Sequence, residues 1–194
     1  MCEVISEPGA TVATGARVSL RRPGAADVPE MAALLTESAD LHRGWVSYPA
    51  SEEQVLAFLT QSPAEGMEVF CVQRRSDEVI VGLTTLCRIS GEPWLTAECG
   101  GAVGVRYQGN GYIAEAMRLL AWFAFSGLGL HRVEALAQPG NGRSHRMLAA
   151  AGFQPEGTAR GAIRIGGTWA DHVRWATTAE DLRFPRGFIA QERG

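Results

Sequence analysis

The sequence lacks lysine: all 18 basic residues in its 194-residue length are arginines. A chain without lysine cannot form a Schiff base with a carbonyl substrate or hold pyridoxal phosphate covalently. It also lacks the lysine that a Walker A phosphate-binding loop requires. Two large classes of enzyme are therefore excluded.

Paired cysteines are also missing. The four cysteines, Cys2, Cys71, Cys87 and Cys99, form no C-x-x-C pair. Zinc and redox sites built on cysteine pairs have that spacing, so the sequence predicts no metal site. Cys71 and Cys87 stand in apolar runs and are expected to be small buried side chains.

Long apolar runs are absent, because no stretch approaches the roughly 18 uninterrupted apolar residues of a membrane helix. Residues 1–15 show neither the basic start nor the apolar core of a signal peptide. The net charge is −3, and the arginines are scattered rather than gathered into a basic patch. We therefore expect a cytoplasmic protein that binds neither nucleic acid nor membrane.

The remaining composition, 46% hydrophobic and 20% charged, is typical of one globular domain. Hydrophobic spacing and turn residues predict seven strands and four helices. The strands are expected at residues 17–21, 68–73, 79–87, 95–105, 131–137, 153–161 and 168–177, and the helices at 25–40, 51–61, 111–128 and 141–151. We expect a single domain over residues 16–182, a frayed tail at 1–15 and a C-terminal tail at 183–194.

One loop carries the strongest chemical signal. Gly109-Asn110-Gly111 follows a predicted strand and precedes the longest predicted helix. Glycine lacks a Cβ, so the backbone N–H groups of such a loop can approach a ligand closely. The first turn of the helix adds unpaired N–H groups and a partial positive charge. The loop therefore suits a pyrophosphate, either that of a dinucleotide or that of coenzyme A.

The dinucleotide alternative rests on Gly109-x-Gly111-x-x-Ala114, which fits the Rossmann fingerprint. Glu134, 23 residues after Gly111, could then be the acid that binds the ribose. However, the loop lies in mid-chain after a predicted antiparallel meander, and only one β-α-β crossover can be recognised. The 60 residues after Glu134 are too few for the remaining crossovers and a substrate domain.

Five motifs in chain order resemble those of the GNAT acetyltransferase superfamily, in particular its RimJ/RimL branch. They are Ala97-Glu98-Cys99-Gly100, Arg106-x-x-Gly109-x-Gly111-Tyr112-x-x-Glu115-Ala116, Gly129-Leu130-His131-Arg132-Val133-Glu134-Ala135, Asn141-x-x-Ser144 with Gly152-Phe153, and Gly167-x-Trp169-x-Asp171-His172. The resemblance covers residues 16–182. It implies the α/β GNAT fold, in which a mixed, mostly antiparallel sheet is flanked by helices and its fourth and fifth strands splay apart.

The resemblance implies an N-acetyltransferase that moves an acetyl group directly from acetyl-CoA to a primary amine, with a protein or peptide N-terminus as the leading acceptor. An α-amine has a pKa of about 7.7–8.0, so a modest base suffices, whereas a lysine at about 10.4 would cost roughly 4–5 kcal/mol to deprotonate. Two alternatives stay open: a small-molecule acetyltransferase acting on an antibiotic, a polyamine or an aminoacyl conjugate, and a non-catalytic acyl-CoA-binding module. The oligomeric state is also open, a homodimer included.

For the cofactor, the resemblance implies that the backbone of Val103 and Val105 pairs with the pantetheine arm and polarises the thioester carbonyl. Arg106 would add a charge-assisted contact to the pyrophosphate. Asn141 is expected to cap its helix, to bind pantetheine, or both. The backbone N–H groups expected to face the pyrophosphate are those of Gln108, Gly109, Asn110, Gly111 and Tyr112.

For catalysis, Glu98 is the candidate base or amine-orienting group, and Ser144 the candidate group that protonates or positions the leaving thiolate. The alternatives are a salt-bridged surface glutamate and a helix-surface serine. His145 points about 100° away from Ser144 around the helix and is expected to be a structural or surface group. No G-x-S-x-G elbow supports Ser-His-Asp catalysis.

For the acceptor, aromatic and ionisable residues gather in two loops and in the predicted closing hairpin. The candidate acceptor-binding residues are His42, Trp45, Tyr48, Trp94, Asp171 and His172. Trp122, Phe123 and Phe125 on the long helix are expected to pack in the core. The branch often has a bulky residue after its A-E-x-G motif, so Gly101-Ala102 here implies a roomier acceptor channel.

Overall fold

The computed structural model describes residues 7–49, 51–60, 66–182 and 189–190. The strands are β1 (Thr11–Thr14), β2 (Val18–Arg21), β3 (Met67–Arg74), β4 (Ile80–Ser90), β5 (Thr96–Val103), β6 (Arg132–Ala137), β7 (Gln154–Ile165), β8 (Thr168–Thr178) and β9 (Ile189–Ala190). The helices are α1 (Val28–Glu37), α2 (Ala39–His42), α3 (Glu52–Leu59), α4 (Tyr112–Ser126) and α5 (Gly142–Ala151), with 3-10 turns η1 (Ala25–Asp27) and η3 (Val105–Tyr107).

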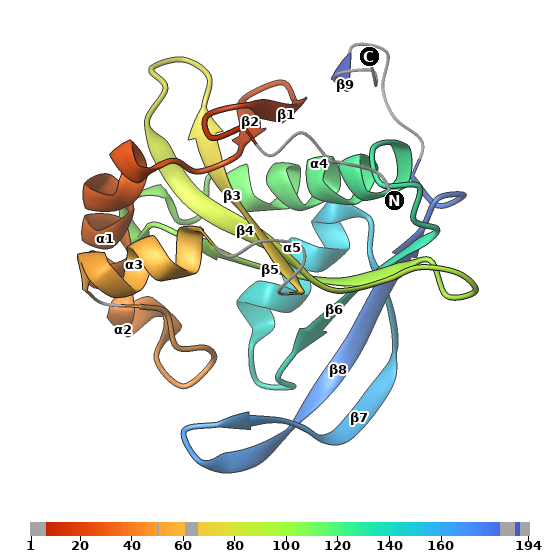
Figure 1. Cartoon of the computed structure of the whole chain (residues 1–194). Coiled ribbons are helices and arrows are strands. Elements are labelled where there is room, and N and C mark those ends of the chain that lie inside the picture. Colours follow the sequence, from red (N-terminus) through yellow and green to blue (C-terminus); the bar gives the residue numbers. More distant parts are fainter. Residues whose placement is uncertain (1–6, 50, 61–65, 183–188, 191–194) are drawn as a thin grey trace.

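Within the described residues, the strands form one sheet in the order β7-β8-β6-β5-β4-β3-β2-β1-β9, with helices on both faces (Figure 1). β5 and β6 are parallel, and the other neighbouring strands are antiparallel. This mixed, mostly antiparallel sheet confirms the predicted fold class. It excludes a doubly wound Rossmann sheet, which needs several parallel neighbours. None of the described helices is both long and apolar enough to cross a membrane.

The ends of the chain differ from the prediction. Thr11–Thr14 pair with β2, so a tail over the whole of residues 1–15 is wrong. Ile189–Ala190 pair with β1 inside the predicted C-terminal tail. The rest of that tail from residue 183 on, and residues 1–6, lie outside the described residues. β1 is only four residues long, and β9 is two residues long and pairs with a segment at the other end of the chain, which is why local periodicity does not reveal them.

The helix predicted at residues 25–40 is divided into η1, α1 and α2. The break falls at Ser38, whose hydroxyl donates to the carbonyl of Leu34 at 2.6 Å. Two other predicted helix ends are confirmed: Ser51 caps α3 by accepting the N–H of Gln54 at 3.2 Å, and Gly152 ends α5 with φ of 96°. That left-handed conformation favours glycine.

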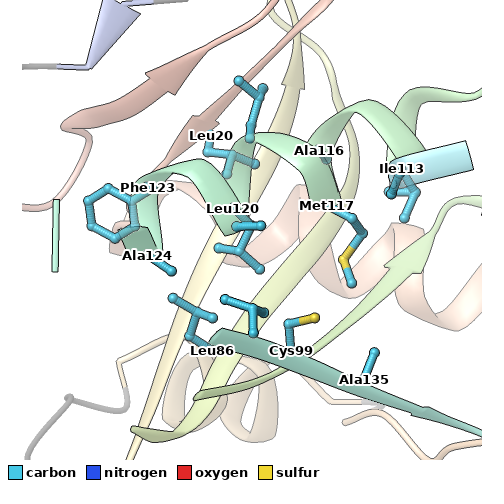
Figure 2. Close-up of a cluster of buried hydrophobic side chains, with 14 of the residues drawn as sticks. Leu20, Leu86, Cys99, Ile113, Ala116, Met117, Leu120, Phe123, Ala124 and Ala135 are labelled. Carbon is cyan, nitrogen blue, oxygen red and sulfur yellow. The ribbon is translucent and has the colours of Figure 1, made fainter. Parts of the chain in front are cut away.

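The apolar face of α4 forms one side of the core. Its residues recur at helical spacing and face side chains from the sheet, as Figure 2 shows for Leu120 and Met117 above Leu86 and Cys99. Phe123 is buried and contacts the ring of Phe70 edge-on, with ring centroids 5.5 Å apart. Trp122 and Phe125 are partly buried against the same cluster, so the predicted packing role of the three aromatics is confirmed.

The opposite face of the sheet is covered by α1 and α3, which pack on a second buried cluster that includes Leu83 and Ala102. Successive side chains of a strand point to opposite faces. In β5, Ala97 and Cys99 therefore face α4, while Glu98 and Ala102 face the other way. Because Ala102 is buried in that cluster, its small side chain fills core space rather than widening an acceptor channel.

The parallel pair β5–β6 separates halfway along. The two strands are paired from Thr96↔Arg132 to Cys99↔Ala135. Beyond that point β5 stays with β4 as far as Gly82↔Val103, and β6 stays with β8 as far as Ala137↔Val173. Gly82 permits the close approach of β4, because a Cβ there would lie 2.3 Å from the Ala102 carbonyl oxygen. The predicted splay is thus confirmed, and it leaves a gap between the two strands.

Leu120→Ala should show that the apolar face of α4 stabilises the fold. The side chain is 0% exposed, and we expect the free energy of unfolding in urea to fall by about 2–5 kcal/mol. Leu56→Ala is the matched control, because Leu56 on α3 is 42% exposed; there we expect a change within about 0.5 kcal/mol. Equal losses in both variants would contradict the assignment.

Candidate functional site

The gap between β5 and β6 is lined on one side by backbone groups at the edge of β5. The N–H of Gly104 donates to the carbonyl of Val81 on β4 at 2.9 Å. Backbone groups alternate in direction along an antiparallel pair, so those of Gly101 and Val103 point away from β4 and toward the gap. The Val103 carbonyl accepts from His42 Nε2 at 3.1 Å. The N–H of Val103 therefore faces the space that the predicted pantetheine arm would fill.

Val105 differs from its prediction. β5 ends at Val103, and Val105 lies in the turn η3. Its N–H donates to the hydroxyl of the buried Ser38 at 2.9 Å, so this group is already engaged. The strand is shorter than predicted because the chain turns at Gly104, where a Cβ would lie 3.0 Å from the Tyr107 ring. The backbone role predicted for Val105 is therefore not supported.

The glycine loop has the conformation that the sequence indicates. Gly109 and Gly111 have φ of 83° and 74°, in the left-handed region that favours glycine. The Asn110 side-chain amide donates to the carbonyls of Tyr107 at 3.1 Å and Gln108 at 3.4 Å, which holds the loop from within. The predicted contribution of the Gln108 N–H is not supported, because it donates to the Val105 carbonyl at 3.4 Å.

The N-terminus of α4 follows directly. Its first backbone bond runs from the N–H of Glu115 to the carbonyl of Gly111 at 3.2 Å. The N–H groups of Tyr112, Ile113 and Ala114 precede that bond and have no carbonyl within the helix. Together with the loop N–H groups and the helix dipole, they form a site suited to an anion.

Arg106 points elsewhere. Its guanidinium donates to Glu37 on α1 at 2.7 Å, rather than lying over the loop as predicted. Such an exposed pair is weak, typically below about 1 kcal/mol. A cavity of about 140 Å³ beside this pair lies between α1 and η3, and neither Glu98 nor Ser144 lines it.

Glu98 is half-buried on the face of the sheet away from α4. Its Oε1 accepts from Arg88 at 2.8 Å, so the salt-bridged alternative holds for the structure as described. Regular alternation along β4 would point Arg88 to the opposite face. A bulge between Cys87 and Ser90, at which Arg88 has φ of 51°, brings its side chain back to Glu98. Arg88 is 72% exposed, so an approaching substrate amine can displace it at small cost.

Glu134 lies opposite Glu98 in the parallel register but has its own partners. It accepts from Arg132 at 2.7 Å and from Arg174 at 3.3 Å. Arg132 also pairs with Glu156. Glu134 is thus part of an ion-pair network on the sheet, not the ribose-binding acid of the Rossmann alternative.

Asn141 and Ser144 lie at the start of α5. The Asn141 Oδ1 accepts the N–H of Ser144 at 3.1 Å, which confirms the predicted N-cap. α5 packs through Leu148 and Ala151 into the same cluster as α4. Ser144 therefore lies on the α4 side of the sheet, whereas Glu98 projects from the opposite face. The gap between β5 and β6 lies between the two candidate catalytic groups.

His145 is structural, as predicted. Its Nδ1 accepts from the Trp175 indole N–H at 3.1 Å, and its Nε2 donates to the Gln138 carbonyl at 3.1 Å. These partners require the neutral tautomer with the proton on Nε2. The ring thereby fixes the loop that leads from β6 into Asn141.

Three of the predicted acceptor residues come together beside the gap. The rings of His42 and Tyr48 meet edge-on with centroids 5.4 Å apart. The Gln138 side-chain amide donates to the Gly44 carbonyl at 2.9 Å. A Cβ on Gly140 would lie 3.6 Å from the Trp45 ring. The segment 42–48 thus reaches from β5 to the loop after β6. Burial raises the pKa of Tyr48, which also contacts Phe58 and is in part a packing residue.

Trp94 lies apart from them, and the described hydrogen bonds of Asp171 and His172 are within their own hairpin. Trp94 is 72% exposed in the turn between β4 and β5, which precedes Thr96 and so lies at the opposite end of β5 from Val103. Asp171 accepts the N–H of Gly161 at 2.8 Å and so holds the β7–β8 hairpin. His172 is 3% exposed, with its Nδ1 3.0 Å from the Ala170 carbonyl. The sequence could not separate Trp94 from the cluster, because its placement depends on the length and path of the strands.

Several contacts at the site have no local sequence signal. Ser38 supports η3, Gln138 joins the two loops across the gap, and Arg17 contacts Glu115 and the glycine loop. Each joins segments more than 60 residues apart. Glu115 belongs to the GNAT-like motif, but its partner lies near the N-terminus and cannot be inferred from spacing.

Protonation of His42 should weaken the fold. Burial holds the pKa of His42 below its ordinary value of 6.5. The unfolded chain then binds the proton at higher pH, so the contribution of His42 is complete above about pH 6.5 and is lost as the pH falls through the folded-state pKa. Urea unfolding between about pH 7.5 and 5 should show a smaller loss of stability in His42→Gln than in the wild type. Identical pH slopes would contradict the buried, neutral state of this ring.

Comparison with known proteins agrees with this geometry. Residues 17–154 match a family model described as an acetyltransferase (GNAT) domain. The chain is 39% identical over 103 residues to the probable N-acetyltransferase YjcK of Bacillus subtilis, a match that covers 53% of this chain and 57% of YjcK. It is 28% identical over 135 residues to the ribosomal protein uS5 alanine N-acetyltransferase of Escherichia coli, covering 69% of this chain and 70% of that protein.

Solved structures show the same fold. Mycobacterium smegmatis RimJ in complex with CoA-disulfide aligns with a TM-score of 0.80 at 23% identity, over 90% of this chain and 91% of that one. The family model covers well over half of the chain, and the sheet, its splay and the glycine loop agree with it. The chain therefore belongs to the GNAT family of acetyltransferases.

Proposed function

We propose that this GNAT acetyltransferase transfers the acetyl group of acetyl-CoA to the α-amine of a protein or peptide N-terminus. The observation that carries the proposal is the gap between β5 and β6. The anion site at Gly109–Tyr112 lies at one end of it, and Glu98 and Ser144 lie on opposite faces of the sheet beside it. An extended cofactor threaded through the gap can be approached by an amine from one face while its sulfur leaves toward the other.

In this proposal the loop binds the pyrophosphate through the N–H groups of Gly109, Gly111 and Tyr112. The pantetheine arm lies in the gap along Gly101 and Val103, where an edge N–H can donate to the thioester carbonyl as negative charge develops on it. Asn141 serves as the helix cap and has its side-chain NH₂ left to bind the arm.

The reaction is a direct transfer. The amine nitrogen attacks the thioester carbon, its bond to that carbon forms, and the carbon–sulfur bond breaks. Glu98, released from Arg88, orients the amine and takes its proton, directly or through water. The Ser144 hydroxyl donates to the departing thiolate. Because both reactants are bound together and the acetyl group passes directly between them, no covalent enzyme intermediate forms.

An N-terminal acceptor fits this modest machinery. At pH 7 roughly a tenth to a fifth of an α-amine is already neutral, so a carboxylate that is paired with arginine in the absence of substrate suffices as base. The names of two similar proteins support the same acceptor: the uS5 alanine N-acetyltransferase above, and RimL, a ribosomal L7/L12 α-N-protein acetyltransferase with a TM-score of 0.77. A ribosomal acceptor would place the reaction in the cytoplasm.

A small-molecule acceptor is the second candidate. The structure of the microcin C7 self-immunity acetyltransferase MccE, solved with acetyl-CoA and AMP, aligns with a TM-score of 0.75 at 19% identity. The half-exposed Trp45 beside the gap would suit a planar group as well as a peptide. This alternative is an explicit outcome of the acceptor test.

The acceptor class can be determined with a defined panel and mass spectrometry. It contains peptides with free N-termini, the same peptides with blocked N-termini and an internal lysine, an aminoglycoside, a polyamine and an aminoacyl nucleotide. We expect acetylation of the free N-termini, with the blocked peptides unmodified. Acetylation confined to lysine side chains or to small molecules would overturn the acceptor assignment.

Ser144→Ala should lower kcat more than it raises KM for acetyl-CoA. A group that protonates a leaving thiolate acts mainly in the transition state, and such groups typically contribute about 10²–10⁴-fold. Ser126→Ala is the matched control, since that hydroxyl donates to the Trp122 carbonyl at the far end of α4. A rise in KM with unchanged kcat would limit Ser144 to cofactor binding, and no change in either would remove it from the site.

A further inference from the structure

Arg17, just before β2, contacts the glycine loop from behind. Its Nη1 donates to the Asn110 carbonyl at 2.8 Å and its Nη2 to the Gly111 carbonyl at 3.4 Å. Its Nε donates to Glu115 Oε2 at 2.9 Å. Its guanidinium carbon also lies 5.3 Å from the centre of the Tyr112 ring. One side chain thus reaches two carbonyls of the loop and the first turn of α4.

Glu115 fixes Arg17 in turn. Its Oε1 accepts the backbone N–H of Arg17 at 2.7 Å and that of Val18 at 3.4 Å. The turn before β2 is fitted around this carboxylate, because a Cβ on Gly15 would lie 2.6 Å from Oε1. The backbone and the guanidinium group of Arg17 are therefore both bound by Glu115, which fixes the direction in which the guanidinium group points.

The direction of the carbonyls determines the direction of the loop N–H groups. In a planar trans peptide, the C=O of one residue and the N–H of the next point opposite ways. Donation to the Asn110 carbonyl therefore turns the N–H of Gly111 away from Arg17. Donation to the Gly111 carbonyl does the same for the N–H of Tyr112. These are two of the three N–H groups that the proposed function assigns to the pyrophosphate.

We propose that Arg17, held by Glu115, is a positioning residue that preorganises the pyrophosphate loop for acetyl-CoA. It acts through the loop backbone, not by contact with the reacting atoms. The inference rests on the proposed cofactor site and deepens it. It also gives a role to Glu115, the acid of the GNAT-like motif, as the anchor of that arginine.

The chain offers a matched control. Arg75 is an exposed arginine beside the same turn, and its Nη1 donates to the carbonyls of Gly15 at 2.8 Å and Ala16 at 3.2 Å. These contacts are with the turn and not with the loop. Arg75→Met therefore removes an equal charge and two similar bonds from the same turn, without releasing the carbonyls of Asn110 and Gly111.

The test measures CoA binding by calorimetry and steady-state kinetics for Arg17→Met, Arg17→Lys and Arg75→Met. We expect Arg17→Met to raise the Kd for CoA and the KM for acetyl-CoA about tenfold or more, with kcat at saturation within about twofold. Arg17→Lys should show most of the same loss, because an ammonium keeps the charge but not the planar fork. Arg75→Met should resemble the wild type. Arg17 is 53% exposed, so the Met variant is expected to fold.

An acetyl donor without a pyrophosphate distinguishes a role of Arg17 in positioning the loop from a general loss of enzyme function. With S-acetylpantetheine, Arg17→Met and the wild type should have the same KM, because the loop has nothing to bind. Equal defects with both donors, unchanged KM for acetyl-CoA, or full recovery in Arg17→Lys would each overturn the proposal. If the wild type itself fails to bind CoA, the proposed cofactor site is wrong, a result that differs from all of these.

Discussion

The site depends on the separation of two parallel strands. β5 and β6 pair with each other only over a short stretch. Beyond it, β5 remains paired with β4 as far as Val103, and β6 remains paired with β8 as far as Ala137. Backbone polar groups at such an edge need partners. His42 donates a hydrogen bond to the Val103 carbonyl. The N–H of Val103 can then bind a ligand that is extended and polar along its length. The pantetheine arm of coenzyme A has that character.

The same separation organises the chemistry around it. α4 and α5 pack on one face, which places the glycine loop and Ser144 on that side, while the alternation of β5 places Glu98 on the other. The segment 42–48 bridges the gap between the two strands, from Val103 at the end of β5 to Gln138 in the loop after β6. Arg17 and Glu115 then align the loop, so a residue from the start of the chain supports a site built from its middle.

Patterns within a segment predicted most of this, and contacts between segments account for what they missed. The apolar period of α4 and the cap at Asn141 are local, and each is confirmed. The turn at Val105 depends on Ser38, the pairing of Glu98 depends on a bulge at Arg88, and the isolation of Trp94 depends on the length of β5. Arg106 precedes the glycine loop, but its side chain pairs with Glu37 of α1 instead of lying over the loop, a contact that depends on a distant segment.

The most direct test of the central claim is a crystal structure of the protein with CoA bound. We expect the pyrophosphate oxygens to accept from the N–H groups of Gly109, Gly111 and Tyr112. The pantetheine arm should lie between β5 and β6, bonded to the N–H of Val103. CoA bound elsewhere, for example in the cavity beside Glu37, with the gap between the strands empty, would contradict the claim.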